Sequence, residues 1–369
     1  MSKIQPLPIH LITGLLGSGK TTTLKQLIQQ KPAAENWGII INEFGEIDID
    51  AASLTQDSQT PILSVSGGCV CCSAQHGLSQ AINQLLSSEQ PLSRIWIEPT
   101  GLGHPAKIID TLTQSTFIRP LTLQKIVCVI TPQQLTEDRW HRSAVMRDLV
   151  TLSDIILLNK QDLSSEAEIN SARNLLQQCY PPKTTIINSQ HGQIELKQLL
   201  QQRPQANLRL LQPSKTLNKQ SATYQRQNDQ NHTEEVNSAA QPFDSSLPGV
   251  EQAIRQINPE LQNITAIGWV FHNRVQFNRN KLKHFFATFS PKLIRAKGIL
   301  KTGNEWQLIN WSLEGDQAQL TFEDIAWRQD SRLECILNKQ NNEQNNEHNN
   351  LELTKVFEIQ LLNCISKTT

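Results

Sequence analysis

The sequence predicts an α/β fold in which a doubly wound, mostly parallel sheet is followed by a smaller α+β domain. Up to about residue 205, short apolar runs rich in Ile and Val alternate with segments whose apolar residues repeat at helical spacing. Such uninterrupted runs suit strands that are buried on both faces between layers of helices. The expected strands are IHLIT, WGIIIN, PILSV, RIWIE, KIVCVIT, DIILLN and KTTIIN.

Helices are expected between these strands, in TTTLKQLIQQ, LSQAINQLLSSE, AKIIDTLTQ and EAEINSARNLLQQ. We assign residues 1–211 to this first domain. Residues 212–262 are polar, rich in Gln and Asn and poor in large apolar residues, so they cannot offset the entropy of ordering and are predicted to be a linker.

The second domain is assigned to residues 263–369. Its expected strands are ITAIGWVF, LIRAKGILKT, WQLINWSL and RLECIL, with a helix in NRNKLKHFFATF. The low-complexity insert 338–350 is predicted to be a solvated loop before a last helix, LTKVFEIQLLNCI. The aromatic side chains of this domain fit two alternatives, a docking surface for a partner or the core of a small sheet; they are Trp269, Phe271, Trp306 and Trp311.

Composition narrows the class of partner and the compartment. The chain has 369 residues, 38% of them hydrophobic, and equal numbers of Lys+Arg and Asp+Glu, 34 each. Because there is no net charge, no generic attraction to nucleic acid or to acidic membranes is expected. No apolar run approaches the roughly 20 residues that span a bilayer. We therefore expect a cytoplasmic protein, in which clustered cysteines are more often metal ligands or catalytic groups than disulfides.

The first strand runs into GLLGSGKT, which fits the phosphate-loop pattern GxxxxGK(S/T), and a helix follows. Glycines in this loop let successive backbone N–H groups turn toward phosphate oxygens, and the start of the helix adds positive potential. Lys20 is expected to reach the β- and γ-phosphates as a catalytic group, and the Thr21 hydroxyl to bind Mg2+. The predicted nucleotide-binding residues of the loop are Gly14, Gly17, Ser18, Gly19, Lys20, Thr21 and Thr22.

The nucleotide base is indicated by NKxD, which Asn159, Lys160 and Asp162 form directly after the strand DIILL. An Asp carboxylate at this place accepts two hydrogen bonds from the N1–H and the exocyclic amine of guanine. Adenine offers no such pair and would leave the carboxylate unpaired. The pattern therefore selects GTP over ATP.

Two further loops are candidates for the hydrolytic switch. In RIWIEPTGLGHP, Glu98 ends a strand and is predicted to support Mg2+ or its waters, and Gly101 offers a backbone N–H to the γ-phosphate. The alternative is a turn with an exposed Glu, and His104 is equally ambiguous. Glu43 follows another strand; it is either part of a first switch, with a tentative metal-ligand role, or part of a solvated loop.

Three of the seven cysteines fall in GGCVCC, as Cys69, Cys71 and Cys72, directly after the strand PILSV. Three thiolates can occupy three corners of a tetrahedral Zn2+ site, but no fourth Cys or His follows at zinc-finger spacing. An open position suits a site from which the metal is transferred. The alternatives are a redox pair or three small buried residues. The remaining cysteines lie singly in apolar patterns and are predicted core residues; they are Cys128, Cys179, Cys335 and Cys364.

The chain resembles the CobW-like GTPases of the P-loop metallochaperone class in five motifs, which occur in the order GLLGSGKTT, NEFGE, GGCVCC, IEPTG and NKQD. In the second domain, RAKGIL is similar to the C-terminal domain of that family. The resemblance implies a GTP-hydrolysing protein that delivers a metal, commonly zinc, bound by Cys69, Cys71 and Cys72. Many members carry a His-rich tract, whereas the polar segments here contain only His232 and His348. The family's switch text usually ends in Asp before Pro, where this chain has His104.

The sequence thus predicts a GTP-gated zinc carrier that uses GTP/GDP, Mg2+ and Zn2+ and serves an unidentified metal-requiring client protein. No arginine finger is evident, so slow intrinsic hydrolysis is expected. The alternatives are a redox-regulated signalling GTPase, or the same carrier acting on cobalt or iron. A homodimer formed on binding of GTP or metal is left open, and neither nucleic acid nor membrane is an expected partner.

Overall fold

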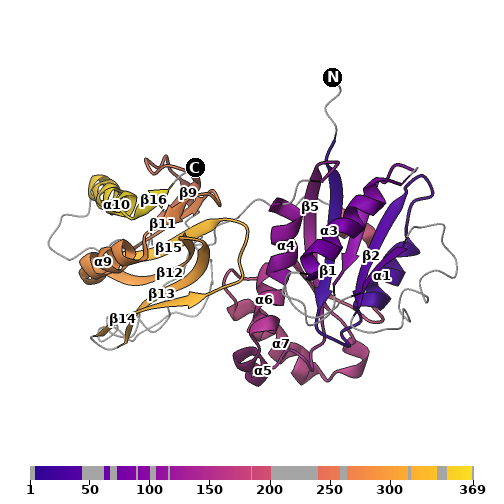
Figure 1. Cartoon of the computed structure of the whole chain (residues 1–369). Helices are drawn as coiled ribbons and strands as arrows, with labels where there is room; N and C mark the ends of the chain where they lie inside the picture. Colours follow the sequence, from indigo (N-terminus) through magenta and orange to yellow (C-terminus); the bar gives the residue numbers. More distant parts are fainter. Residues whose placement is uncertain are drawn as a thin grey trace. The chain divides into compact units, whose positions relative to one another are not determined.

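The computed structural model divides into two compact units, Met1–Pro204 and Gln205–Thr369 (Figure 1). The described residues are 5–43, 62–66, 73–88, 90–99, 105–114, 117–183, 185–200, 240–257, 264–314, 317–338 and 347–367.

The described part of the first unit contains a seven-stranded sheet in the order β3-β2-β4-β1-β5-β6-β7, with every neighbouring pair parallel. Each strand overlaps one of the seven predicted apolar runs, which confirms the predicted fold class for this unit. The strands are β1 (Leu7–Gly14), β2 (Trp37–Glu43), β3 (Ile62–Ser66), β4 (Arg94–Glu98), β5 (Leu121–Ile130), β6 (Ile155–Leu158) and β7 (Ile186–Asn188).

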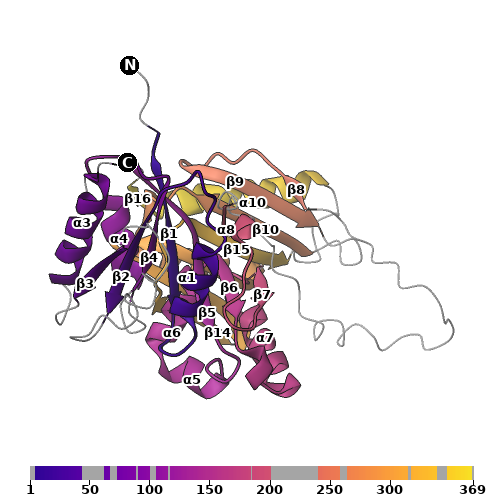
Figure 2. The same cartoon turned by 90° about the vertical axis from the view of Figure 1, so that its right-hand side faces the viewer.

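Helices cover both faces of this sheet (Figures 1 and 2). Alternate residues of β5 point to the two faces. Val127 and Val129 belong to the core cluster that contains residues of α1 and α8. Cys128 and Ile130 belong to the cluster that contains residues of α6 and α7. The helices are α1 (Lys20–Ile28), α3 (Ser73–Leu86), α4 (Pro105–Gln114), α5 (Glu137–Arg142), α6 (Ala144–Leu152), α7 (Glu166–Gln178) and α8 (Leu196–Leu200).

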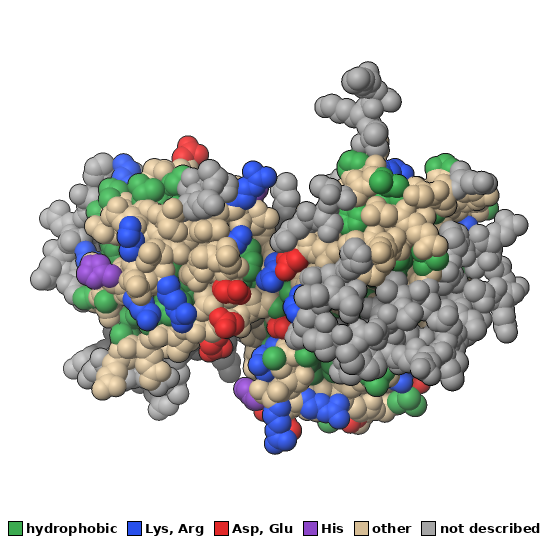
Figure 3. Space-filling model, viewed as in Figure 1, with side chains coloured by type: hydrophobic (Ala, Val, Ile, Leu, Met, Phe, Trp, Pro, Cys, Tyr) green, Lys and Arg blue, Asp and Glu red, His purple; other side chains and the backbone are tan. Residues whose placement is uncertain are grey.

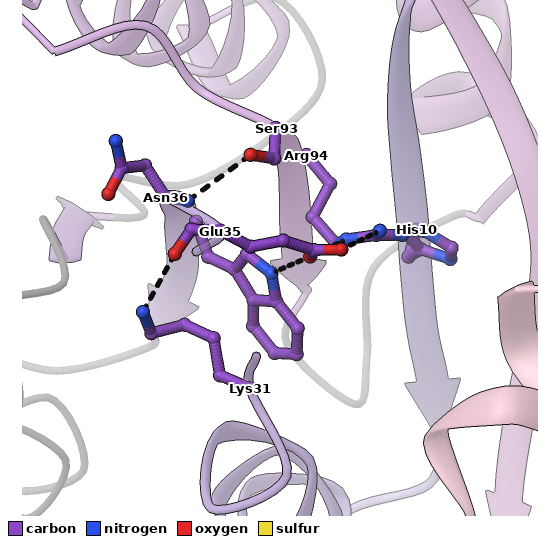
Figure 4. A network of polar contacts seen from close by, with 7 residues as sticks. His10, Lys31, Glu35, Asn36, Ser93 and Arg94 are labelled. Atoms are coloured by element: carbon purple, nitrogen blue, oxygen red, sulfur yellow. Dashed lines mark hydrogen bonds and ion pairs between the residues drawn. The ribbon is translucent and has the colours of Figure 1, made fainter. Parts of the chain in front are cut away.

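The amino ends of the strands carry a network of polar contacts (Figure 4). The guanidinium of Arg94 donates to both carboxylate oxygens of Glu35 at 2.8 and 2.9 Å, and to Nε2 of His10 at 3.2 Å. The indole N–H of Trp37 also donates to Glu35, at 2.6 Å. Burial, together with the adjacent guanidinium, lowers the pKa of His10 to about 3. His10 is therefore neutral in the folded chain, with its ring stacked on Trp96 at a centroid distance of 4.2 Å.

The second unit is built on a mostly antiparallel sheet in the order β14-β13-β12-β15-β10-β9-β8, with β11 and β16 paired at its side. Two helices, α9 (Arg279–Phe289) and α10 (Glu347–Leu362), pack on its hydrophobic core. Lys and Arg side chains gather around α9 on its surface (Figure 3). The strands are β8 (Gln241–Pro242), β9 (Val250–Ile257), β10 (Ile264–Phe271), β11 (Gln276–Phe277), β12 (Leu293–Thr302), β13 (Glu305–Glu314), β14 (Gln317–Asp324), β15 (Ser331–Asn338) and β16 (Ile365–Lys367).

The aromatic residues of this unit are buried. Trp269 and Phe271 have no exposed surface, and Trp306 and Trp311 are at most 4% exposed. The core alternative is therefore correct for these side chains, and the docking-surface alternative is wrong. Trp269 and Phe271 on β10 and Trp311 on β13 belong instead to the hydrophobic core on which α9 and α10 pack.

The limits of the second unit differ from those expected. Strands β8 and β9 lie inside residues 212–262, which the sequence predicted as linker, and α10 begins at Glu347, inside the predicted insert 338–350. Half of the residues of β9, VEQAIRQI, are polar and occur in adjacent pairs rather than in strict alternation with apolar ones, so the segment resembles polar linker. Residues 201–239 and 339–346 lie outside the described residues. No helix in the described part of the chain is long and apolar enough to cross a membrane.

Candidate nucleotide-binding site

The phosphate loop connects the end of β1 to the start of α1, and its glycines are required by geometry. Gly14 has a φ of 143°, and a Cβ on it would lie 2.0 Å from the carbonyl oxygen of Val129. Gly19 has a φ of 102°, and a Cβ there would lie 2.4 Å from the Asn159 carboxamide. Any larger residue at either place would separate the loop from β5 or from the segment after β6. The loop can thus turn its backbone N–H groups inward, as phosphate binding requires.

Lys20 and Thr21 begin α1, at the amino end of its dipole. Lys20 is buried, and its Nζ donates to the carbonyl oxygen of Leu15 at 3.2 Å, so the amine lies over the loop. Thr21 Oγ1 donates to Glu98 Oε1 at 2.7 Å. Glu98 is 5% exposed at the carboxyl end of β4, the neighbour of β1. A hydroxyl and a carboxylate oxygen in contact are hard ligands of the kind that Mg2+ prefers, so these residues fit the ion.

Asn159 ties the predicted base-binding segment to the phosphate loop. Its carboxamide donates to the carbonyl oxygen of Ser18 at 2.9 Å and accepts from the backbone N–H of Gly192 at 3.0 Å. Lys160 follows with a φ of 57°, and Asp162 lies in the next short turn with its side chain exposed at this edge. The motif therefore lies beside the phosphate loop.

The segment after β7, which holds Asn159 in place, was not predicted from the sequence. A Cβ on Gly192, whose φ is 70°, would lie 2.7 Å from the backbone nitrogen of Thr23, so this turn fits closely against α1. Further on, the Gln30 carboxamide donates to the carbonyl oxygen of Ile194 and accepts from the N–H of Leu196, both at 2.9 Å. The turn-forming letters NSQHG after the strand KTTIIN were the available signal.

A second missed feature is a pair of adjacent glutamines in the turn after β5, Gln133 and Gln134, which we call the glutamine bracket. Gln134 Nε2 donates to the carbonyl oxygen of Leu16, at the tip of the phosphate loop, at 2.8 Å. Gln133 Nε2 donates to the carbonyl oxygen of Leu163, directly after Asp162. The bracket thus holds the phosphate-binding and base-binding segments at once.

Several predicted site residues cannot be placed. Cys69, Cys71, Cys72, Gly101 and His104 lie outside the described residues. Glu43 is the last residue of β2 and pairs with Ser66, the last residue of β3, so the chain enters the cysteine segment from the same edge of the sheet. Within the described ranges, no three His, Cys, Asp or Glu side chains form a metal-binding group.

The isolated cysteines behave as predicted. Cys128, Cys335 and Cys364 are buried, and Cys179 is half-buried. Burial raises the pKa of Cys128 to about 12, so its thiol stays protonated and is a poor metal ligand.

Comparisons with known proteins identify the family of each unit. Residues 8–187 match the family described as CobW/HypB/UreG, nucleotide-binding domain, and residues 266–348 match the cobalamin synthesis protein cobW C-terminal domain. The chain is 31% identical over 331 residues to zinc chaperone YeiR of Escherichia coli strain K12, covering 90% of this chain and 93% of that protein. It is 30% identical over 197 residues to zinc chaperone YjiA of the same strain, covering 52% and 60%. The crystal structure of the Zn(II)-bound YjiA GTPase aligns with 98% of this chain and 99% of its own at 16% identity, with a TM-score of 0.40.

Proposed function

Because this chain belongs to the CobW/HypB/UreG family of P-loop GTPases, we propose that it binds zinc at Cys69, Cys71 and Cys72 and transfers it to a client protein under the control of GTP. The observation that carries the proposal is the Thr21–Glu98 contact of 2.7 Å, at the edge of the sheet where β3 also ends before the cysteines. The proposal places the nucleotide and the thiolates along one edge of the sheet. The relative named zinc chaperone YeiR, aligned over 90% of this chain, supports the choice of metal.

The predicted site residues have the following roles in this proposal. The Asp162 carboxylate selects guanine, and Asn159 holds the base-binding segment against the phosphate loop. Lys20 stabilises charge that develops on the phosphates during hydrolysis. Thr21 and Glu98 would hold Mg2+, which supplies neutralisation of the phosphate charge when it is bound. Gly101 is proposed to offer a backbone N–H to the γ-phosphate.

Zinc is the cargo of the proposed reaction. Soft thiolates suit Zn2+, and sites of this kind bind it with about 10 to 16 kcal/mol in small peptides, which is too tight for spontaneous release. A nucleotide that binds the two conformations of the site unequally can shift the site to its weaker form. Glu43, whose strand ends beside β3, is the proposed switchable ligand. A cytosolic location, where thiols stay reduced, is part of the proposal.

The test is the dissociation constant of Zn2+ measured with a non-hydrolysable GTP analogue and with GDP. We expect at least about tenfold weaker binding in one nucleotide state, a difference of about 1.4 kcal/mol. Cys71→Ser should weaken zinc binding in both states, whereas Cys179→Ser, which changes a half-buried cysteine at the end of α7, should leave it unchanged.

Equal zinc affinity in the two nucleotide states would remove the carrier mechanism. Nucleotide affinity that shifts when the thiols are oxidised would favour the redox-regulated GTPase instead. Tighter selection of cobalt or iron by the same measurement would keep the mechanism and change the cargo.

A further inference from the structure

The second unit has an uneven distribution of charge along its sequence. From Ile264 to Asn304 the chain contains no Asp or Glu, although the whole protein has equal numbers of acidic and basic residues. The same stretch contains eight Lys and Arg residues: Arg274, Arg279, Lys281, Lys283, Lys292, Arg295, Lys297 and Lys301. Three of these eight, Arg279, Lys281 and Lys283, lie on one helix, α9.

On α9 the cations share the solvent side. Leu282, Phe285, Phe286 and Phe289 are buried in the core, which fixes the orientation of the helix. The opposite side is exposed and consists of Arg279, Lys281, Lys283 and His284, which we call the basic face of α9. Figure 3 shows this side of the unit with Lys and Arg side chains and few acidic ones.

The described side chains of neighbouring elements form no ion pair with the basic face of α9. The Arg279 guanidinium lies over the ring of Phe322 on β14, 4.9 Å from its centroid, which positions the cation without neutralising it. Asp324, on the same strand, accepts a hydrogen bond from Gln307 instead. Among the described residues, no carboxylate forms an ion pair with Lys281 or Lys283.

The arrangement is unfavourable for the helix itself. Its first turn contains Arg279 and Lys281 and no acidic residue, so positive charge is placed at the positive end of the helix dipole. Arg279 and Lys283 are also like charges at i and i+4, which repel one another. A feature that weakens the element that carries it, and has no partner in the described fold, indicates a role at the surface.

We propose that the basic face of α9 is a docking site for an acidic surface of a partner protein. Complementary charge guides such encounters and fixes their orientation. The other exposed positions of α9 are small or polar, Asn280, Ala287 and Thr288, and every aromatic ring of α9 is buried. The helix therefore lacks the stacking rings that bind single-stranded nucleic acid and the apolar wedge that enters a membrane.

The inference rests on the proposed function only in naming the partner as the client that receives the metal. Docking through α9 requires neither zinc nor nucleotide. The docking proposal can therefore be disproved while nucleotide-dependent zinc binding is confirmed, and docking can be confirmed while nucleotide-dependent zinc binding is disproved.

The experiment measures binding of a fluorescent poly-glutamate peptide to the full-length chain by anisotropy. The double variant Lys281→Glu/Lys283→Glu should weaken binding by about fivefold to thirtyfold, since two attractions become repulsions. Lys355→Glu is the matched control, because Lys355 is also an exposed lysine on a helix of the second unit. Its effect should be less than about twofold per charge.

Thermal unfolding separates docking from folding. Because the charge reversal relieves repulsion at the start of α9, the double variant should unfold at the same temperature or slightly higher. Lys283→Gln, which removes one charge without reversing it, should give a smaller loss of binding and no loss of stability. Its nucleotide-dependent zinc affinity should equal that of the parent chain.

Two results would overturn the proposal. If Lys355→Glu weakens peptide binding as much as the α9 substitutions, the effect reflects net charge and α9 has no special role. If single-stranded DNA or vesicles rich in phosphatidylserine bind more tightly than poly-glutamate through the same lysines, the partner is not an acidic protein.

Discussion

The two edges of the first unit's sheet carry polar groups of different character. At the amino edge, Glu35, Arg94 and His10 contact one another, and the Glu35 and Arg94 side chains are 24% and 12% exposed (Figure 4). At the carboxyl edge, Thr21 and Glu98 meet beside a glycine loop whose backbone N–H groups can turn toward a ligand. The comparison indicates that the first edge stabilises the fold and the second binds the nucleotide. Substitutions should therefore separate stability from activity according to the edge they change.

The largest effect is expected at the carboxyl edge. Lys20→Ala should lower GTP turnover by about 100- to 1000-fold, because it removes a cation aimed at developing phosphate charge. The free energy of unfolding should change by less than about 1 kcal/mol. Hydrolysis assays and urea unfolding of the same preparation measure both quantities. Lys25→Ala, on the same helix, is the control; turnover of the Lys20 variant within threefold of the parent would break the comparison.

At the amino edge the outcome should be reversed. Arg94→Met should lower the free energy of unfolding by about 2 kcal/mol, because Glu35 and His10 lose their shared donor in a partly buried site. Urea unfolding measures the loss, and GDP affinity should stay within about twofold of the parent. In a double-mutant cycle with Glu35→Gln, the losses in free energy of unfolding should be non-additive, since both substitutions remove the same contact. A large loss of GDP affinity would show that the two edges are coupled.

The amino edge also predicts a pH dependence. His10 has its pKa lowered from 6.5 to about 3, so between these values the unfolded chain binds a proton that the folded chain does not. Stability from this group is therefore full above pH 6.5 and falls as the pH decreases, by about 1.4 kcal/mol per pH unit below about pH 6. His10→Phe, which keeps a ring against Trp96, should lose less stability than the parent between pH 7.5 and 5 in urea titrations. An identical loss in both chains would contradict the prediction.

The smallest effects should come from the glutamine bracket, which acts on the carboxyl edge through backbone carbonyls. Gln134→Leu should weaken GDP and GTP by about threefold to tenfold, whatever the base, because it releases the phosphate loop. Gln133→Leu should instead reduce discrimination between GTP and ITP, which lacks the exocyclic amine that Asp162 reads. Isothermal titration with both nucleotides measures these changes.

The control for the bracket is Gln124→Leu, near the other end of β5, where the carboxamide bonds only locally to Thr122. If Gln133→Leu and Gln134→Leu shifted the GTP-to-ITP ratio equally, the bracket would not divide its action between the two segments.

The sequence predicted most of the carboxyl edge, because local chemistry places it there. Glycines, Lys20, Thr21 and Asn159 follow strands whose apolar composition is unambiguous. It predicted neither Gln134 nor Gly192, since their contacts join residues far apart in the chain: Gln134 and Leu16 are 118 positions apart. The chemistry of a single glutamine or turn does not reveal its distant partner.

A different reason, the polar composition of exposed strands, explains why elements of the second unit were missed. Strand β14 lies at the end of the sheet order, and its residues Gln317, Gln319 and Thr321 are exposed, so its pattern is too polar to indicate a strand. Strand β10 lies inside the sheet and is buried along its whole length, and its apolar run predicted it. Burial on both faces is thus what made a strand recognisable.

Strand β4 joins the two edges within five residues. Arg94, Trp96 and Glu98 alternate along it and therefore point to one face, with the ion pair at one end and the Thr21 contact at the other. Insertion or deletion of a single residue within RIWIE would turn one of these end groups to the opposite face. Residues can therefore be inserted or deleted on either side of β4, whereas the number of residues between its two ends must stay the same for both contacts to form.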